Sequence, residues 1–243
     1  MKRKGTFVII DGIDGSGKGT LVSALVARAR KKKLKVFDVV AYEKKHHTLP
    51  EPRELKNYWV IRTSEPTHSL IGRAIRQEII RKNTRDYSGL STAQAYALDR
   101  LILYRRVIIP ALMAGKYVFQ ERGVTTTLAY QPVQAEHLAL RTIMQLDGNA
   151  QALTWRPDLL VLLKIRPRTA LIRLHARTAK QDNAIFETLH FFEKLESRFH
   201  SAWYKKIFTS RGSAVRVVDT DGTLQDSRKR LMEVWEEFQR SRG

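Results

Sequence analysis

The stretch TFVIIDGIDGSGKGT, residues 6–20, decides the fold because it joins an apolar strand to a glycine-rich turn and then to a helix. Its apolar and β-branched start predicts a buried strand. Gly12, Gly15 and Gly17 let backbone N–H groups turn toward an anion, and a helix that begins near Lys18 adds the positive end of its dipole. The order of strand, glycines, lysine and helix therefore predicts a phosphate-binding loop.

Lys18 is expected to reach the β- and γ-phosphates of a bound nucleotide. Gly19 departs from the usual pattern, because a Ser or Thr normally follows the lysine and offers its hydroxyl to magnesium. Thr20 supplies a hydroxyl one residue later, so it is the candidate magnesium ligand on this loop. The predicted nucleotide-binding residues are Gly12, Ile13, Asp14, Gly15, Ser16, Gly17, Lys18, Gly19 and Thr20.

The rest of the chain alternates apolar strands with amphipathic helices, a pattern typical of an α/β fold with a doubly wound parallel sheet. The predicted strands are 6–11, 35–40, 58–62, 117–121, 159–165 and 214–218. The predicted helices lie near 18–30, 70–81, 93–113, 136–146, 169–177, 185–208 and 224–240. Segment 41–57 is polar, contains two prolines and lacks a clear period, so we expect an excursion from the sheet.

Composition limits the possible functions. The 243 residues suit one domain, 1–243. With no cysteine there is no disulfide or thiolate nucleophile, and the apolar runs fall short of the roughly 20 residues of a membrane span, so a cytoplasmic location is expected. The net charge of +20 predicts attraction to anions, and nucleic-acid binding stays an alternative that the scattered basic runs do not favour.

The segment GSGKGT resembles the loop of nucleoside monophosphate kinases, and five later segments resemble the thymidylate kinase family. These are TSEPTHSLIGRAIR (63–76), YALDR (96–100), ERGVTTTLAYQ (121–131), RPDLLVLLKI (156–165) and FFEKLESRF (191–199). The resemblance implies a P-loop kinase with a mobile helical lid at about 173–187. It also implies transfer of the ATP γ-phosphate to dTMP, Mg²⁺ as cofactor and a homodimer. A kinase for another nucleotide or a deoxynucleoside, and a non-catalytic nucleotide-binding protein, are the alternatives.

A base-binding pair is predicted on the helix near 93–113. Tyr96 and Arg100 are four residues apart and share one helical face, where a ring can stack on a base while a guanidinium donates to its carbonyl oxygen. The resemblance implies these roles toward thymine. The alternative is that Tyr96 packs in the core and Arg100 forms a structural ion pair.

Glu121 and Arg122 close an apolar strand, at the edge where ligands bind in open parallel sheets. The resemblance implies that Arg122 clamps the acceptor phosphate and that Glu121 positions magnesium, although the family usually has the shorter Asp. It further implies that Tyr130 lies under the sugar, Thr126 lies near the base, and Asp14 contacts the 3′-hydroxyl. A structural Glu-Arg pair and a loop-stabilising Asp14 are the alternatives.

Ser64 stands where the family has an arginine in its Thr-Arg-Glu-Pro segment. We expect the phosphate contact either to be absent or to come from Arg62, Arg73 or Arg76.

Phosphoryl transfer needs in-line positioning and cations around the transferred group, which arginines on a lid can supply. Arg173 and Arg177 are one helical turn apart, and Lys180 follows them. Asn183 replaces a family arginine. The predicted catalytic residues are Lys18, Arg122, Arg173 and Arg177, while a solvated basic helix is the alternative for the lid.

Overall fold

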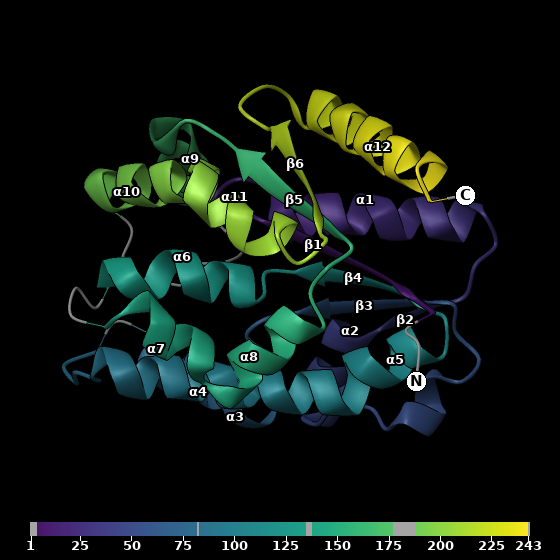
Figure 1. The fold of residues 1–243 in the computed structure, drawn as a ribbon, viewed down its shortest axis with the longest axis horizontal. Coiled ribbons are helices and arrows are strands. Elements are labelled where there is room, and N and C mark those ends of the chain that lie inside the picture. Colours follow the sequence, from purple (N-terminus) through teal and green to yellow (C-terminus); the bar gives the residue numbers. More distant parts are fainter. Residues whose placement is uncertain (1–3, 82, 135–137, 177–187, 243) are drawn as a thin grey trace.

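A six-stranded sheet forms the centre of the computed structural model, which describes residues 4–81, 83–134, 138–176 and 188–242 (Figure 1). All strand pairs are parallel and the strand order is β2-β3-β4-β1-β5-β6. The strands are β1 (Thr6–Asp11), β2 (Val36–Asp38), β3 (Val60–Ser64), β4 (Tyr117–Glu121), β5 (Leu159–Lys164) and β6 (Ala214–Asp219). The doubly wound α/β fold and all six predicted strands are confirmed, with ends that agree or differ by at most two residues.

Helices cover both faces of the sheet. They are α1 (Lys18–Lys31), α2 (Val39–His46), α3 (Leu70–Ala74), α4 (Gly89–Leu103), α5 (Ile109–Met113), α6 (Val124–Gln134), α7 (Leu140–Gln145), α8 (Asp147–Thr154), α9 (Pro167–His175), α10 (Leu189–His200), α11 (Ala202–Thr209) and α12 (Leu224–Arg240). A 3-10 turn lies at Pro52–Leu55, and π-helical turns at Ile75–Ile79 and Tyr104–Ile108 extend α3 and α4. None of the described helices is long and apolar enough to cross a membrane.

The central strand β1 separates two hydrophobic cores. Phe7 and Ile9 face the core that α4, α6, α10 and α11 cover, whereas Val8 and Ile10 face the core under α1 and α12. Side chains alternate between the faces of a strand, so a strand buried on both faces must be apolar at every position. Figure 1 shows α1 and α12 side by side on one side of the sheet, with the larger group of helices on the other.

The expected strand at 35–40 and the expected excursion at 41–57 need correction. Asp38 ends β2 and caps α2, because its side chain accepts a hydrogen bond from the backbone N–H of Ala41 at 3.1 Å. Val39 and Val40 therefore begin a helix instead of completing the strand. The segment does leave the sheet, but it is largely helical, and Leu49 and Leu55 are buried in the core.

Besides α2, two further helices were not predicted, and one predicted helix is divided. α6 and α8 were missed, whereas the helix expected at 136–146 corresponds only to the short α7 among the described residues. The helix expected at 185–208 consists, where it is described, of α10 and α11. They separate at Ser201, which is extended (ψ 149°) and caps α11.

The chain reverses direction across the sheet beside β1. The connection from β1 leads to the edge strand β2, while the connection from β4 leads to β5 on the other side of β1. Ligands of open α/β sheets bind at the carboxyl ends of the strands where this reversal occurs. The phosphate loop follows β1 and Arg122 follows β4, so both lie at this edge.

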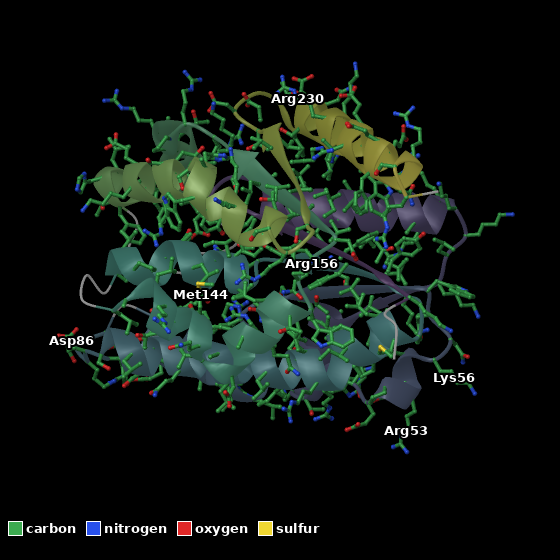
Figure 2. The ribbon with its side chains drawn as sticks, in the orientation of Figure 1. Arg53, Lys56, Asp86, Met144, Arg156 and Arg230 are labelled. Atoms are coloured by element: carbon green, nitrogen blue, oxygen red, sulfur yellow. The ribbon has the colours of Figure 1, made fainter. Side chains whose placement is uncertain are left out.

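Charged side chains project from well-separated parts of the surface. In Figure 2, Arg53 and Lys56 extend from one end of the molecule and Arg230 from α12 on another side. All three residues are exposed. The positive charge is therefore distributed over the molecule and is not confined to one face.

Candidate active site

The loop after β1 has the backbone of an anion site. Gly15 has a φ of +80°, and a Cβ placed on it would lie 2.3 Å from the carbonyl oxygen of Ala170 at the start of α9. Gly17 caps α1 with a φ of 91° and no side-chain hydrogen bond, so the first N–H groups of α1 face the loop. The side-chain oxygen of Ser16 is buried and has no hydrogen-bond partner among the described residues. These free donors suit phosphate oxygens.

Lys18 is folded back onto this loop. Its Nζ donates to the carbonyl oxygens of Gly12 at 3.0 Å and Ile13 at 2.8 Å, and lies 3.6 Å from the carboxylate of Asp14. Burial lowers the pKa of Lys18 to about 8, and the nearby charge of Arg122 acts in the same direction. In the absence of a ligand, the ammonium group is therefore bound by carbonyl oxygens, which an anion such as phosphate can replace.

Asp14, Arg122 and Tyr130 form one partly buried cluster, although they come from three segments. Arg122 Nη2 donates to Asp14 Oδ1, the Tyr130 hydroxyl donates to Asp14 Oδ2 at 3.1 Å, and the guanidinium carbon lies 5.7 Å from the centre of the Tyr130 ring. Burial lowers the pKa of Arg122, but Asp14, followed by Tyr130, Asp11 and Glu121, together more than offset this and raise that pKa well above its usual value. Burial likewise raises the pKa of Tyr130 well above its usual range.

The carboxylate of Asp11, which the sequence analysis did not select, organises the ends of β1 and α6. It accepts hydrogen bonds from the backbone N–H of Gly12 at 2.8 Å and from the hydroxyl of Thr126 at 2.6 Å, and Thr125 donates to it as well. Thr126 lines the cavity, but its hydroxyl donates its hydrogen bond to Asp11. The sequence signal that could have identified Asp11 is that an acidic residue ends an otherwise apolar strand.

Arg100 is held rigidly from three sides. Its Nε donates to Glu65 at 2.8 Å, its Nη2 donates to the Thr127 hydroxyl at 2.9 Å, and its Nη1 donates to Asn149. Arg100 and Glu65 are buried, and burial raises the pKa of Glu65. The structural ion pair considered for Arg100 is present, and its partner is Glu65. Even so, Arg100 still lines the central cavity.

Tyr96 lies one turn before Arg100 on α4 and lines the same cavity. It is partly exposed and belongs to neither hydrophobic core, so the packing alternative does not describe it. Burial by the cavity wall raises the pKa of its hydroxyl to about 12. Its ring is therefore available as a flat apolar surface.

A cis peptide bond joins Glu65 to Pro66 and begins a tightly held turn. Arg76 Nε donates to the carbonyl oxygen of Thr67 at 3.0 Å, while the Thr67 hydroxyl donates to Asp99 at 2.6 Å. From the other side, the buried carboxylate of Glu43 in α2 accepts from this turn. Glu43 and Asp99 were not selected from the sequence.

The three arginines considered as substitutes for the missing one at position 64 are placed differently. Arg62 and Arg76 line the cavity, and Arg62 pairs with Asp38 at 2.9 Å. Arg73 is exposed and does not line it. The structure therefore brings two of the three to the cavity.

Arg173 points toward the loop between β6 and α12. Its guanidinium donates to the carbonyl oxygens of Thr220 at 2.7 Å, Asp221 at 3.3 Å and Gly222 at 2.7 Å. Among the described residues, Leu174 is the residue of α9 that lines the cavity, whereas Arg173 does not line it. Arg177, Lys180 and Asn183 of the expected lid lie outside the described residues.

One cavity of about 630 Å³ unites these groups. Its walls come from the phosphate loop, the ends of β3 and β4, and helices α4 and α6. Among its lining residues are Lys18, Thr20, Tyr96, Arg100, Glu121, Arg122 and Tyr130. The phosphate loop follows the first strand, and Arg122 follows β4 at the point where the strand order of the parallel sheet reverses. This combination is that of a P-loop kinase.

The chain belongs to the thymidylate kinase family. The family model described as thymidylate kinase matches residues 46–214. A probable thymidylate kinase of Pyrococcus horikoshii is 33% identical over 177 residues, which is 72% of each chain. The thymidylate kinase of Legionella pneumophila is 27% identical over 96% of this chain and 95% of its own. That of Caldicellulosiruptor saccharolyticus is 26% identical over 98% and 100%.

Proposed function

We propose that the chain transfers the γ-phosphate of ATP to dTMP and releases dTDP. The observation that carries this proposal is that one cavity contains the loop with Lys18, the pair Tyr96 and Arg100, and Arg122. A donor phosphate, an acceptor base and an acceptor phosphate thus each have a chemically suitable partner in the same space. Membership of the family supports the same reaction, with ATP as the phosphate donor.

On the donor side, the loop N–H groups and Lys18 bind the phosphate chain. The Lys18 ammonium exchanges the carbonyls of Gly12 and Ile13 for phosphate oxygens, whose full negative charge attracts it more strongly. Because the charge on these oxygens changes during transfer, Lys18 contributes to turnover and not only to binding.

On the acceptor side, Tyr96 stacks on thymine and Arg100 donates to its carbonyl oxygen. Hydrogen bonds to described residues use three of the five guanidinium N–H groups of Arg100, and Nη2 also lies 2.6 Å from Glu65 Oε2. The second N–H of Nη1 is therefore the one proposed to donate to the base. The Tyr130 ring supports the sugar, Asp14 accepts from the 3′-hydroxyl, and Arg122 holds the acceptor phosphate. Thr126 acts indirectly, because its hydroxyl donates a hydrogen bond to Asp11.

Mg²⁺ fits this cavity because carboxylate and hydroxyl oxygens are the ligands it prefers. Glu121 and Thr20 both line the cavity and would hold the ion or its waters. When bound, the ion would neutralise charge on the donor phosphates.

The roles of the arginines after β5 are proposed separately. Arg173 holds the loop between β6 and α12 through three carbonyls, so we assign it the task of positioning that loop. Arg177 remains the proposed lid cation. We further propose one domain, a homodimer and a cytoplasmic location. Light scattering tests the dimer, which has twice the 28.0 kDa mass of the chain.

The test is a panel of acceptors with ATP and Mg²⁺, in which each product is separated by chromatography. dTMP is expected to give dTDP with the highest kcat/KM, ahead of dUMP and dCMP. Phosphorylation of thymidine to dTMP, or preference for another nucleotide, would contradict the assignment of the acceptor. If the protein converted neither ATP nor dTMP but bound DNA tightly and in a salt-sensitive way, that result would favour the non-catalytic alternative.

A further inference from the structure

Gly19 and the carboxylate of Glu121 occupy adjoining space. A Cβ placed on Gly19 would lie 2.8 Å from Oε2 and 3.5 Å from Oε1 of Glu121. Carbon and oxygen atoms do not approach within 3.0 Å without one of them moving, so a Ser or Thr at position 19 would displace this carboxylate. The departure in the loop, Gly19, and the departure at the end of β4, Glu121, therefore adjoin each other.

The backbone does not require glycine at position 19. Gly19 lies in the first turn of α1 and lacks the left-handed conformation of Gly15 and Gly17. Within a helix, glycine is about 1 kcal/mol less favourable than alanine. What glycine provides here is room for Glu121.

Glu121 has the surroundings of a ligand group. Among the described residues its carboxylate has no hydrogen-bond or ion-pair partner, and it lines the cavity beside Thr20. It lies next to the N-terminus of α1, whose first turn contains no acidic residue and whose cap has no side-chain hydrogen bond. A negative charge is favourable at that end of a helix.

Ser64 supplies a second, independent oxygen. It is the register partner of Glu121 in the neighbouring strand β3, so both side chains lie on the same face of the sheet. The Ser64 hydroxyl is buried, lines the cavity and has no hydrogen-bond partner among the described residues. An unpartnered hydroxyl and an unpartnered carboxylate side by side suit a hard divalent cation.

We propose that Gly19 and Glu121 act as one unit, in which the carboxylate of Glu121 replaces the loop hydroxyl as oxygen donor to the divalent cation of the bound nucleotide. The inference rests on the proposed kinase function. Glu121 is longer than the family's Asp by one C–C bond, about 1.5 Å, which lets it reach the space that position 19 leaves open. Either departure alone would impair the site, and the two together compensate each other.

A double-mutant cycle tests this coupling by metal binding. Mn²⁺ is titrated into the complex of the protein with ADP, and free Mn²⁺ is followed by electron paramagnetic resonance. Gly19→Ser and Glu121→Asp are each expected to weaken Mn²⁺ binding by at least about tenfold, the first by displacing the carboxylate and the second by shortening it. The double variant regains the usual hydroxyl and acid, and should bind Mn²⁺ within about threefold of wild type.

Matched controls are Ala202→Ser, at an exposed position of α11, and Glu233→Asp, at an exposed position of α12. Neither should change Mn²⁺ affinity. Melting temperature and metal-free ADP affinity establish that the site variants are folded. A double variant whose loss equals the product of the two single losses would overturn the proposal, as would unchanged Mn²⁺ affinity in either single variant. The acceptor panel tests the kinase reaction separately, since wild type can fail there while the coupling holds.

Discussion

Lys18 is the residue whose titration should be visible in the activity. In the free protein its pKa is lowered to about 8, so its ammonium loses its proton as the pH rises through that value. We expect kcat/KM for ATP, which reports the free enzyme, to fall above about pH 8. The fall in kcat should come at higher pH, because bound phosphates hold the ammonium charged. A kcat/KM that stays level to pH 9.5 would contradict this assignment.

Removing the Lys18 side chain should separate catalysis from folding. Lys18→Ala is expected to lower turnover by at least about a hundredfold, because charge on the transferred oxygens changes during the reaction. KM for dTMP should change little. The control Lys229→Ala alters an exposed residue on α12, and both variants are compared by steady-state kinetics and by melting temperature. Turnover equal to wild type would remove Lys18 from the catalytic residues.

Arg100 requires a paired substitution, because it shares a buried ion pair with Glu65. Arg100→Ala alone leaves a buried carboxylate without its partner, which typically costs about 3–5 kcal/mol of stability. The double variant Arg100→Met with Glu65→Gln removes both charges. We expect it to fold and to lose about ten- to a hundredfold in kcat/KM for dTMP, with KM for ATP unchanged.

Glu65→Gln alone keeps the guanidinium but leaves that buried charge without its charged partner. It is therefore compared with the double variant in both melting temperature and kinetics. If the double variant matched Glu65→Gln in the dTMP panel, Arg100 would have no role in binding the base. The melting temperature of each variant shows whether a kinetic loss comes from the cavity or from unfolding.

Sequence reasoning found the residues that carry recognisable chemistry and missed those that hold them. Lys18, Tyr96 and Arg122 stand in local patterns, and all line the cavity. Asn149 and Glu65 contact Arg100 across 49 and 35 residues of chain, so no local spacing relates them. Such partners are fixed by tertiary packing.

At the scale of elements, Glu43 joins α2 to the turn before α3. Its carboxylate accepts from the Ser69 hydroxyl at 3.0 Å and from the backbone N–H of His68 at 3.2 Å. Burial raises the Glu43 pKa to about 7 from 4.5, so the folded protein binds a proton more tightly than the unfolded chain. Stability must therefore fall as the pH rises between these two values.

Glu43→Gln should remove that dependence. Between about pH 5 and pH 7, the wild-type free energy of unfolding should decrease relative to that of the variant by up to about 1.4 kcal/mol per pH unit. Urea unfolding at several pH values measures the difference. Glu233→Gln, on the exposed side of α12, is the matched control and should run parallel to wild type. A constant difference for Glu43→Gln would contradict the raised pKa.

The elements differ in how far their sequences determine them. The central strands were predictable because strands buried on both faces are apolar throughout. α6 was not, because it begins with valine and three threonines and contains Pro132, all poor helix formers. Its start is fixed instead by Asp11, which accepts from the hydroxyls of Thr125 and Thr126. In α2, the cap at Asp38 overrode the β-branched pair that follows it.

At the scale of the whole molecule, the net charge of +20 should govern the encounter with nucleotides. Raising NaCl from about 50 mM to about 300 mM should lower kcat/KM for ATP more than kcat, because salt screens long-range attraction. Reversing the charge of Arg228, Lys229 and Arg230 to Glu changes the net charge by six, to +14, at exposed positions. The salt dependence should then become shallower. An unchanged slope would show that only charges inside the cavity matter.

Gly15 and Gly19, two of the crowded glycines in residues 6–20, predict different genetic behaviour. A side chain at Gly15 would meet the carbonyl oxygen of Ala170, which is backbone and persists whatever residue stands at position 170. At Gly19 the obstacle is a side chain, that of Glu121, which a second mutation can shorten. A suppressor screen starting from Gly15→Ala should therefore return only reversions at that codon, whereas one starting from Gly19→Ser should also return changes at position 121.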